Sequence, residues 1–229
     1  MLDVNSLRVA YGESEILHGL DFRVGPGEIV AVMGRNGMGK TTLMKSLMGV
    51  IPTRSGRVTL DGTEITGLKS HQRVATGAAY VPQGRQIFST MTVEENIETG
   101  LTVTGEREVP GEIYELFPVL LEMKSRRGGN LSGGQQQQLA IARALASKPK
   151  VLLLDEPTEG IQPSIIREMG RTLKQIRDDR GLSIVVSEQV LSFALDVADR
   201  VLVLENGEFA FESARDGIDE DRVAKFLSV

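Results

Sequence analysis

The feature that most constrains the fold is the octapeptide GRNGMGKT, residues 34–41. It lies between a short apolar run typical of a buried strand, Ile29–Met33, and a helical stretch, Thr41–Gly49. Glycines let the backbone wrap so that successive N–H groups face one anion, and the lysine adds a mobile cation. A chance glycine-rich turn would not need a strand before it and a helix after it. The pattern therefore predicts a phosphate loop, and with it an α/β domain that binds a nucleotide.

Within this loop, Lys40 is expected to reach the β and γ oxygens of the nucleotide, and the Thr41 hydroxyl is expected to bind Mg²⁺. The cofactors that we expect are therefore ATP and Mg²⁺. The predicted nucleotide contacts of the loop and the residue after it are Gly34, Arg35, Asn36, Gly37, Met38, Gly39, Lys40, Thr41 and Thr42.

A second pattern, VLLLDEPT, ends an apolar strand with Asp155 and Glu156. Ligands of open α/β sheets bind at the carboxyl ends of the strands. One carboxylate can hold the Mg²⁺ ion, while the next can orient or deprotonate a water molecule for attack. We assign Asp155 to the metal and Glu156 to the water. The alternative is a solvated pair of charges at a strand end.

Strand and helix patterns alternate at both ends of the chain, and this alternation predicts a mostly parallel sheet preceded by antiparallel strands. Between residues 84 and 145 the pattern is helical instead, with a capping box at Thr92 and Glu95 and a helical stretch over residues 110–123. We therefore expect a single domain of 229 residues. Its core comprises residues 1–83 and 146–229, and residues 84–145 form a helical insert.

Composition excludes several classes of site and partner. The chain has no cysteine, so it has no disulfide, no thiolate metal site and no cysteine nucleophile. A net charge of −5 argues against nucleic-acid binding. No apolar run approaches the ~20 residues that span a bilayer. The N-terminus lacks the basic and long apolar regions of a signal peptide, and we expect the chain to stay in the cytosol.

A second glycine turn, Ser132–Gln135, lies in the segment LSGGQQQQ. Serine is a good N-cap, glycines admit a close approach, and the start of a helix carries positive potential. This turn therefore also suits a phosphate. The rival interpretation of the glutamine run is a disordered polar tract. The apolar helical pattern that follows it, over residues 139–146, favours a helix.

Three segments in this order, GRNGMGKT, LSGGQ and VLLLDEP, make the chain resemble an ATP-binding-cassette (ABC) transporter ATPase over nearly its whole length. In that family two cassettes associate head to tail with ATP between them. The resemblance implies that Ser132, Gly133 and Gly134 face the γ-phosphate of the partner's nucleotide, and that Gln135 can donate its side-chain amide. The second glycine turn would then serve a nucleotide bound by another subunit.

The resemblance assigns two more residues. Gln83 in YVPQ matches the glutamine loop, which implies a ligand of Mg²⁺ that also senses the γ-phosphate. Tyr11 matches the aromatic residue that stacks on adenine, and such stacking is worth roughly 1–3 kcal/mol. The alternatives are a solvated turn residue for Gln83 and an ordinary strand aromatic for Tyr11. The expected metal ligands are thus Thr41, Gln83 and Asp155.

The chain departs from the family pattern at two positions. Gln189 stands where most members have a histidine, and Gln162 stands where an aspartate is common. A glutamine can hydrogen-bond a phosphate oxygen but cannot titrate near neutral pH. We therefore expect Gln189 to position the phosphate in catalysis beside Lys40 and Glu156, the alternative being a plain surface amide. Gln162 is left out of the site.

The segments YVPQGRQIF and TVEENI resemble the ATPases of branched-chain amino-acid-type importers, and YELFPVL and EPTEGIQPSII resemble the second ATPase of urea importers. The resemblance implies uptake of a small polar solute, first urea, with a branched-chain amino acid as the alternative. It also implies a location on the cytoplasmic face of the bacterial inner membrane. The partners would be a second ATPase in a heterodimer (a homodimer forming in isolation), two permease subunits and, indirectly, a substrate-binding protein.

The transport reading predicts a groove on the helical insert that receives a cytoplasmic helix of the permease. Its candidate residues are Gly84–Phe88 and Thr92–Ile97. Two readings of other classes stay open: a soluble ABC protein acting on nucleic acid or ribosomes, and a nucleotide-dependent scaffold of an assembly complex. The net negative charge argues against the first, and Glu156 argues against a scaffold that has lost hydrolysis.

Overall fold

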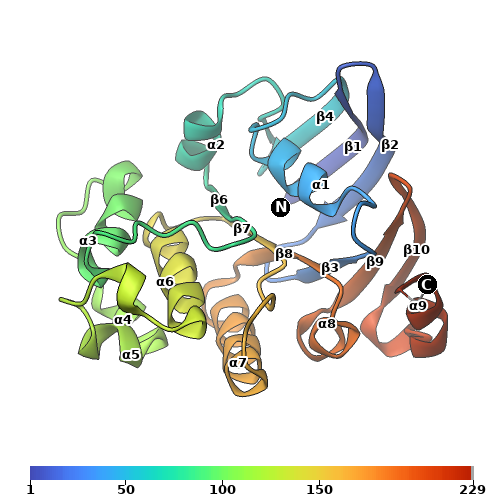
Figure 1. The fold of residues 1–229 in the computed structure, drawn as a ribbon. Coiled ribbons are helices and arrows are strands. Elements are labelled where there is room, and N and C mark those ends of the chain that lie inside the picture. The colour runs from blue at the N-terminus through green and yellow to red at the C-terminus, as the bar shows by residue number, and fades with distance from the viewer. Residues whose placement is uncertain (228–229) are drawn as a thin grey trace.

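The chain forms two sheets with one helix between them and a group of helices at one side (Figure 1). The structure is a computed structural model, and it describes residues 1–227. The first sheet is antiparallel, in the order β2-β1-β4-β5. Its strands are β1 (Leu2–Tyr11), β2 (Ser14–Val24), β4 (Ser55–Leu60) and β5 (Thr63–Glu64). This sheet confirms the antiparallel strands expected at the N-terminus.

The second sheet has the order β10-β9-β3-β8-β7-β6, and all its pairs are parallel except β9 with β10. Its strands are β3 (Ile29–Met33), β6 (Ala78–Val81), β7 (Val151–Asp155), β8 (Ser183–Glu188), β9 (Arg200–Glu205) and β10 (Glu208–Ala214). The last two turn at Asn206 and Gly207, both with positive φ, as the Asn-Gly hairpin pattern predicts. The mostly parallel core is confirmed.

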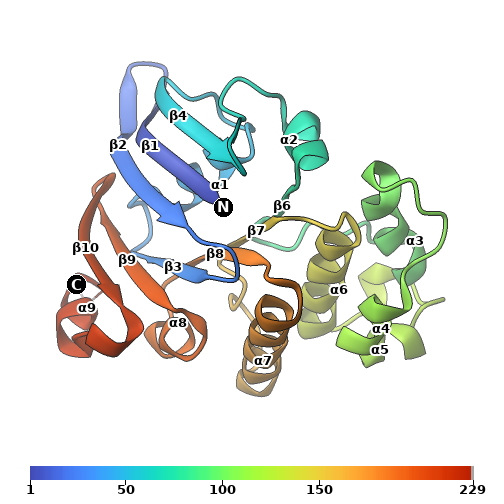
Figure 2. The ribbon, with the colours of Figure 1, turned by 180° about the vertical axis from the view of Figure 1, so that it is seen from behind.

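Strand β3 shows why the core strands read as continuous apolar runs. Ile29, Ala31 and Met33 point into one hydrophobic cluster, while Val30 and Val32 point into the other. The second cluster is filled by helix α1 (Lys40–Leu47), which lies between the two sheets (Figure 2). Burial on both faces requires apolar residues at every position, so the alternation of a half-exposed strand is absent.

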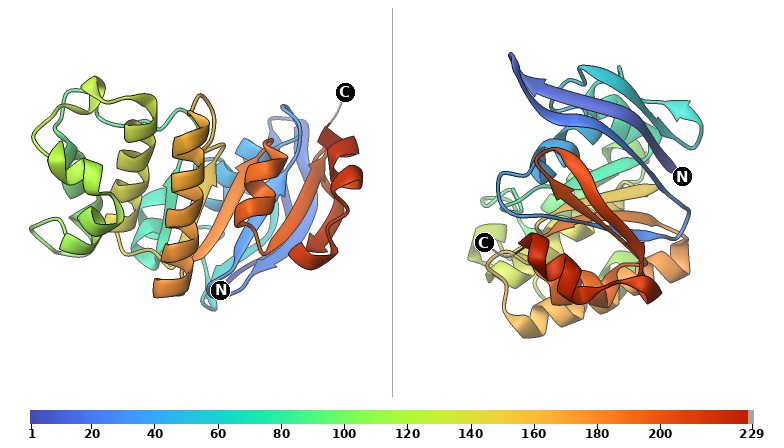
Figure 3. Two further views of the ribbon diagram at one scale, coloured as in Figure 1. Left: turned by 90° about the horizontal axis from the view of Figure 1, so that it is seen from below. Right: turned by 90° about the vertical axis from the view of Figure 1, so that its right-hand side faces the viewer.

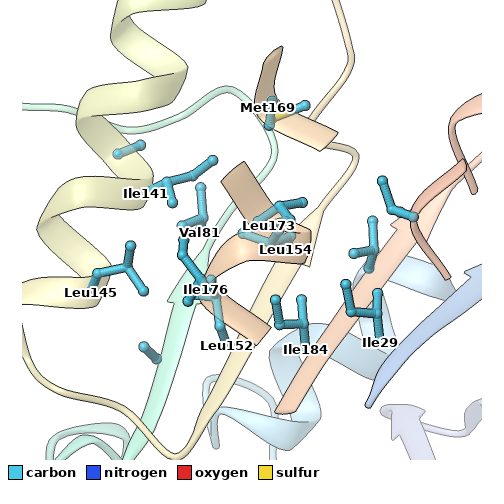
Figure 4. Packing of buried hydrophobic residues seen from close by; sticks show 14 of the residues in the cluster. Ile29, Val81, Ile141, Leu145, Leu152, Leu154, Met169, Leu173, Ile176 and Ile184 are labelled. Atoms are coloured by element: carbon cyan, nitrogen blue, oxygen red, sulfur yellow. The ribbon is translucent and has the colours of Figure 1, made fainter. Parts of the chain in front are cut away.

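The opposite face of the parallel sheet is covered by α6 (Gly133–Ala146) and α7 (Pro163–Arg180). Figure 4 shows Ile141 and Leu145 of α6 and Leu173 of α7 converging on the sheet residues Leu152 and Leu154. The remaining helices of the core are α2 (Ser70–Thr76), α8 (Leu191–Val197), a 3-10 turn (Arg215–Gly217) and α9 (Glu220–Leu227). No described helix is long and apolar enough to cross a membrane.

The helical insert lies at one end of the molecule, opposite α9 (Figure 3). It contains α3 (Val93–Glu98), α4 (Gly111–Leu116), α5 (Pro118–Glu122), α6 and the 3-10 turns η1 (Thr99–Val103) and η2 (Gly128–Asn130). The capping box of Thr92 and Glu95 forms as expected. The helical stretch over residues 110–123 is interrupted at Phe117, because the proline that follows disfavours helical geometry at the residue before it.

A buried arginine stabilises the end of α1. The side chain of Arg73, on α2, is 1% exposed, and its guanidinium donates to the carbonyls of Ser46 and Leu47 at the end of α1. It also donates to the carbonyls of Leu68 and Thr66. Helix ends leave carbonyls without partners, and a cation there also complements the helix dipole. Arg73 therefore fixes the helix that begins at Lys40.

Replacing Arg73 with methionine should lower the free energy of unfolding by about 3 kcal/mol, because buried carbonyls lose their donors. Urea unfolding followed by circular dichroism measures the change. The matched control is Arg57→Met, since Arg57 is exposed and pairs only with Glu64 on the surface. The control should shift stability by no more than about 0.5 kcal/mol. Equal shifts for the two variants would contradict the role given to Arg73.

Candidate functional site

The phosphate loop joins β3 to α1 and adopts a backbone that only glycine tolerates at its key positions. Gly39 has φ +108°, and a Cβ there would lie 2.8 Å from Leu17 Cδ2. A Cβ on Gly34 would lie 2.6 Å from the carbonyl oxygen of Leu204. Gly37 also has positive φ. These constraints explain the glycine spacing, and they leave the N–H groups at the start of α1 available to an anion.

The loop borders a pocket of about 310 Å³ whose lining includes half of the predicted site residues. Its lining residues are Tyr11, Ile16, Asn36, Gly37, Gly39, Lys40, Thr41, Thr42, Gln83 and Glu156. Tyr11 is 53% exposed, so its ring is open to a ligand. Ile16 is an addition that the sequence did not suggest. Elements far apart in the chain therefore meet where the phosphate loop was predicted.

Three predicted loop residues, Gly34, Arg35 and Met38, do not line the pocket. The carbonyls of Gly34 and Arg35 accept hydrogen bonds from Lys40 Nζ at 2.6 and 3.0 Å. Met38 Sδ lies 3.4 Å from the backbone nitrogen of Asn206, in the β9–β10 turn. These residues shape the loop and hold Lys40, whereas a nucleotide in the pocket would meet their neighbours.

Lys40 and Glu156 form a buried ion pair in the pocket. Lys40 Nζ lies 3.0 Å from Glu156 Oε1, and the two side chains are 3% and 9% exposed. The ammonium is thereby shared between two loop carbonyls and one carboxylate. Removing one partner from a buried pair is costly, so only another anion can take the place of Glu156 without leaving Lys40 unpaired.

Asp155 lies at the end of β7 and joins three segments. Its Oδ1 accepts from Thr41 Oγ1 at 3.2 Å and from Ser187 Oγ at 2.6 Å, and its Oδ2 accepts from the Tyr80 hydroxyl at 3.1 Å. The side chain is 1% exposed. Burial raises the pKa of the Tyr80 hydroxyl, and the charge of Asp155 raises it further. The Tyr80 hydroxyl therefore stays protonated and donates a hydrogen bond to this carboxylate.

The residues present fit a magnesium ion better than a metal held by protein alone. In the part of the chain that the structure describes, no three His, Cys, Asp or Glu side chains form a metal cluster. Magnesium needs only one or two carboxylates, together with substrate phosphates and water. Asp155 and Thr41, in contact beside the phosphate loop, supply a carboxylate and a hydroxyl of that kind.

Gln83 lines the same pocket, but its amide nitrogen is directed to carboxylates. It lies 3.2 Å from Glu156 Oε2 and 3.1 Å from Glu159 Oε2. Among the described residues, no hydrogen bond joins Gln83 to Thr41 or Asp155. Of the three predicted metal ligands, Thr41 and Asp155 are therefore in mutual contact, whereas Gln83 contacts Glu156 and Glu159.

Glu156 is held from several sides. Besides Lys40 and Gln83, it accepts a hydrogen bond at 3.1 Å from Gln189 Nε2, which also donates to Asn36 Oδ1 at 2.8 Å. Its backbone has φ +47°, an uncommon value for a residue with a side chain. Such strain persists only where neighbours over-determine it. Gln189 is thus in direct contact with the carboxylate of Glu156.

The second glycine turn lies elsewhere. Ser132 is the N-cap of α6: its Oγ accepts from the backbone nitrogen of Gln135 at 3.3 Å, and Gln135 Oε1 accepts from that of Ser132 at 2.9 Å. None of Ser132, Gly133, Gly134 or Gln135 lines the 310 Å³ pocket. The structure therefore does not unite the two phosphate-facing glycine turns of one chain.

A larger groove of about 790 Å³ lies beside the helical insert. Gln86 and Phe88 line it, as expected for the segment Gly84–Phe88. The expected segment Thr92–Ile97 does not, because Val93, Asn96 and Ile97 are buried inside the insert. The complete lining is Lys45, Val50, Val74, Ala79, Tyr80, Pro82, Gln86, Phe88, Thr99, Gly100, Thr102, Arg143, Ala144 and Ser147.

Several residues around the site escaped the sequence analysis. Arg85 donates to the carbonyl of Glu159 at 3.1 Å, and Arg143 donates to the carbonyl of Gln86 at 3.0 Å. Tyr80 and Ser187 hold Asp155. The strand ends offered one clue, since β6 and β8 flank β7 and their carboxyl ends reach the same edge.

Comparison with known proteins gives this site a family. Residues 17–159 match the family described as ABC transporter. The branched-chain amino acid transport ATP-binding protein BraG of Pseudomonas aeruginosa is 42% identical over 210 residues, covering 90% of each chain. The probable branched-chain amino acid transport ATP-binding protein LivF of Archaeoglobus fulgidus is 38% identical, covering 98% of this chain and 97% of its own.

Solved structures agree with the fold. A dimeric ATP-binding cassette in a post-hydrolysis state, bound to ADP and Pi, superimposes with a TM-score of 0.85 and 25% identity, covering 95% of this chain and all of that one. The present chain has the same arrangement of strands and helices as that cassette. It combines the phosphate loop, the acidic strand end and the helical insert in one fold. The chain therefore belongs to the ATP-binding subunits of ABC transporters and is an ATPase.

Proposed function

We propose that this ATPase drives an importer of branched-chain amino acids. BraG and LivF, with which it shares 42% and 38% of aligned residues, are both named for transport of that class of solute. The sequence analysis placed urea first and branched-chain amino acids second, and these relatives favour the second. Urea remains the second candidate solute, because the segments YELFPVL and EPTEGIQPSII resemble the second ATPase of urea importers.

The observation that carries the proposed motor, in which two cassettes share each ATP site, is the separation of the two glycine turns. The pocket holds the phosphate loop, Glu156 and Gln83, while Ser132 caps a helix outside it. Each chain thus offers two half-sites, and a second cassette placed head to tail would complete both. The related cassette with bound ADP and Pi is itself dimeric. In the importer we expect a second, different ATPase subunit as the partner, and a homodimer in isolation.

The chemistry of the site follows from its contacts. Lys40, now paired with Glu156, would bind the β and γ oxygens of ATP, and Tyr11 would stack on adenine. Thr41, Asp155 and Gln83 would hold Mg²⁺, which neutralises charge on the phosphates when bound. Glu156 would orient the attacking water and accept its proton, while Gln189 and Gln83 keep that carboxylate in place.

Replacing Glu156 with glutamine should leave ATP binding intact and slow turnover by about 10²–10⁴-fold, because the base is lost while the shape is kept. ATP should then accumulate in a closed dimer, which size-exclusion chromatography detects. Glu122→Gln, on the exposed surface of α5, is the control and should hydrolyse ATP at the normal rate. Normal turnover in the Glu156 variant would remove it from the catalytic role.

A mixing experiment tests whether the site is shared between chains. Lys40→Ala and Ser132→Arg should each abolish turnover in a homodimer, because each damages both composite sites. In a mixed dimer, one site combines the intact Lys40 of one chain with the intact Ser132 of the other. An equimolar mixture should therefore regain about a quarter of wild-type turnover by random pairing. A mixture as inactive as its components would refute the head-to-tail arrangement.

The groove beside the insert is the proposed contact with the permease, so that the two cassettes of the dimer would contact the two permease subunits. It is lined by apolar and small residues together with the cations Lys45 and Arg143. Phe88 and Val50 are 48% and 56% exposed. Nucleotide-driven closure of the dimer would move this groove and thereby shift the permease between states. The chain would accordingly sit on the cytoplasmic face of the inner membrane through protein contacts, with a substrate-binding protein delivering solute on the other side.

The absence of cysteine makes this contact easy to map. Phe88→Cys and Val50→Cys each introduce a single thiol into the groove, and both should form crosslinks to single-cysteine permease variants in membranes. Leu121→Cys is the control, because Leu121 is 50% exposed but does not line the groove. Crosslinking of the control with equal yield, or of none of the three, would contradict the docking surface.

Transport itself decides between the two solutes. The ATPase, its sister ATPase and both permease subunits, reconstituted in vesicles with the binding protein, should take up labelled leucine in an ATP-dependent way. Urea uptake without leucine uptake would overturn the assignment of solute and support the alternative. Uptake that does not depend on ATP, or on Glu156, would overturn the function as a transport motor.

A further inference from the structure

Glu188, the last residue of β8, is a buried carboxylate that the chemistry above does not use. Its side chain is 2% exposed. Its Oε1 accepts from the backbone nitrogen of Thr158 at 3.0 Å, and its Oε2 accepts from those of Gln189 and Val190 at 3.0 and 3.3 Å. Among residues 1–227, no ion pair includes Glu188. Burial raises the pKa of this carboxyl, and the hydrogen bonds of the Thr158 side chain and of the three backbone amides partly oppose that rise.

The three amides belong to the two loops that carry the proposed catalytic side chains. Thr158 follows Glu156 by two residues, and Gln189 directly follows Glu188. The side chains of Glu156 and Gln189 meet at 3.1 Å in the pocket. The neighbouring residue of β8, Ser187, holds the backbone nitrogen of Glu156 through its carbonyl at 3.0 Å. The end of β8 thus fixes both loops, one through Ser187 and both through Glu188.

The donors are arranged so that only a carboxylate satisfies them all. One donor approaches Oε1 and two approach Oε2, so both oxygens must accept. A glutamine has one acceptor oxygen and would place its NH₂ group against the amides on one side. Burying a carboxylate costs free energy unless hydrogen bonds compensate for the lost water. A residue whose only role is to end β8 would not need a buried carboxylate.

We propose that Glu188 is a positioning residue for ATP hydrolysis, whose carboxylate joins the loop after Glu156 to the turn at Gln189 and so holds their two side chains in register. This inference rests on the roles proposed for Glu156 and Gln189. Glu188 does not line the pocket, so it acts on the reaction through these neighbours and not through the nucleotide.

The test is steady-state hydrolysis by Glu188→Gln, together with ATP binding measured in the Glu156→Gln background. The glutamine loses the amide hydrogen bonds to one of the two oxygens of Glu188, which should lower kcat about tenfold. KM and the Kd for ATP should stay within about twofold of the wild-type values. Glu188→Asp keeps two acceptor oxygens and should show an intermediate kcat, and it carries the test if the glutamine variant does not fold.

The matched control is Glu28→Gln. Glu28 also accepts a backbone N–H, that of Gly25 at 2.7 Å, but it pairs with Arg200 on another part of the parallel sheet. This control should lose stability without losing kcat. A Glu188→Gln enzyme with normal kcat and only a lower melting temperature would overturn the proposal, as would a parallel rise in KM and Kd.

A double-mutant cycle of Glu188→Gln with Gln189→Ala tests whether Glu188 acts on hydrolysis through Gln189. If Glu188 acts by placing Gln189, the double variant should be little slower than the worse single variant, because the two losses overlap. Fully additive losses would overturn the proposal. Normal turnover in both Glu156→Gln and Gln189→Ala would instead remove the proposed function of the site, so the two failures are distinguishable.

Discussion

The hydrogen bond between Thr41 and Asp155 is the contact on which the site depends. It brings the start of α1 to the end of β7 across a gap of 114 residues in sequence. Tyr80 and Ser187 hold the same carboxylate from the two strands that flank β7. Because Asp155 is almost fully buried, none of these polar groups can exchange its partner for water without a cost. The phosphate loop is therefore placed by the sheet and not by its own sequence.

The fold was predictable wherever burial imposes one residue type at every position. The run Ile29–Met33 and the pattern ending in Asp155 had to be buried strands, and the glycine spacing of residues 34–41 had to be a loop around an anion. Predictions of which face of a helix is exposed were less accurate than predictions of the buried strands. The capping box located the start of α3, but it carried no information that Val93 and Ile97 would pack inward and leave the groove to η1.

The site was predictable where a residue's chemistry depends on its immediate neighbours in sequence. Lys40, Thr41 and Asp155 are of that kind. Glu188 and Arg85 are not, because their roles come from partners in other loops: the amide of Thr158 in one case and the carbonyl of Glu159 in the other. From the sequence alone, Glu188 is an ordinary charged residue; the structure shows that it is buried and accepts hydrogen bonds from three backbone amides.

The pairing of Lys40 with Glu156 connects these local contacts to the function proposed for the chain. The ammonium that should bind the γ-phosphate is the same one that neutralises the proposed base. A phosphate bound to Lys40 would therefore compete with Glu156 for this ammonium, and the amides of Gln83 and Gln189 would remain as partners of the carboxylate. A bound nucleotide would thus leave Glu156 held by the two glutamines, and keeping both glutamines in place is the task proposed for Glu188.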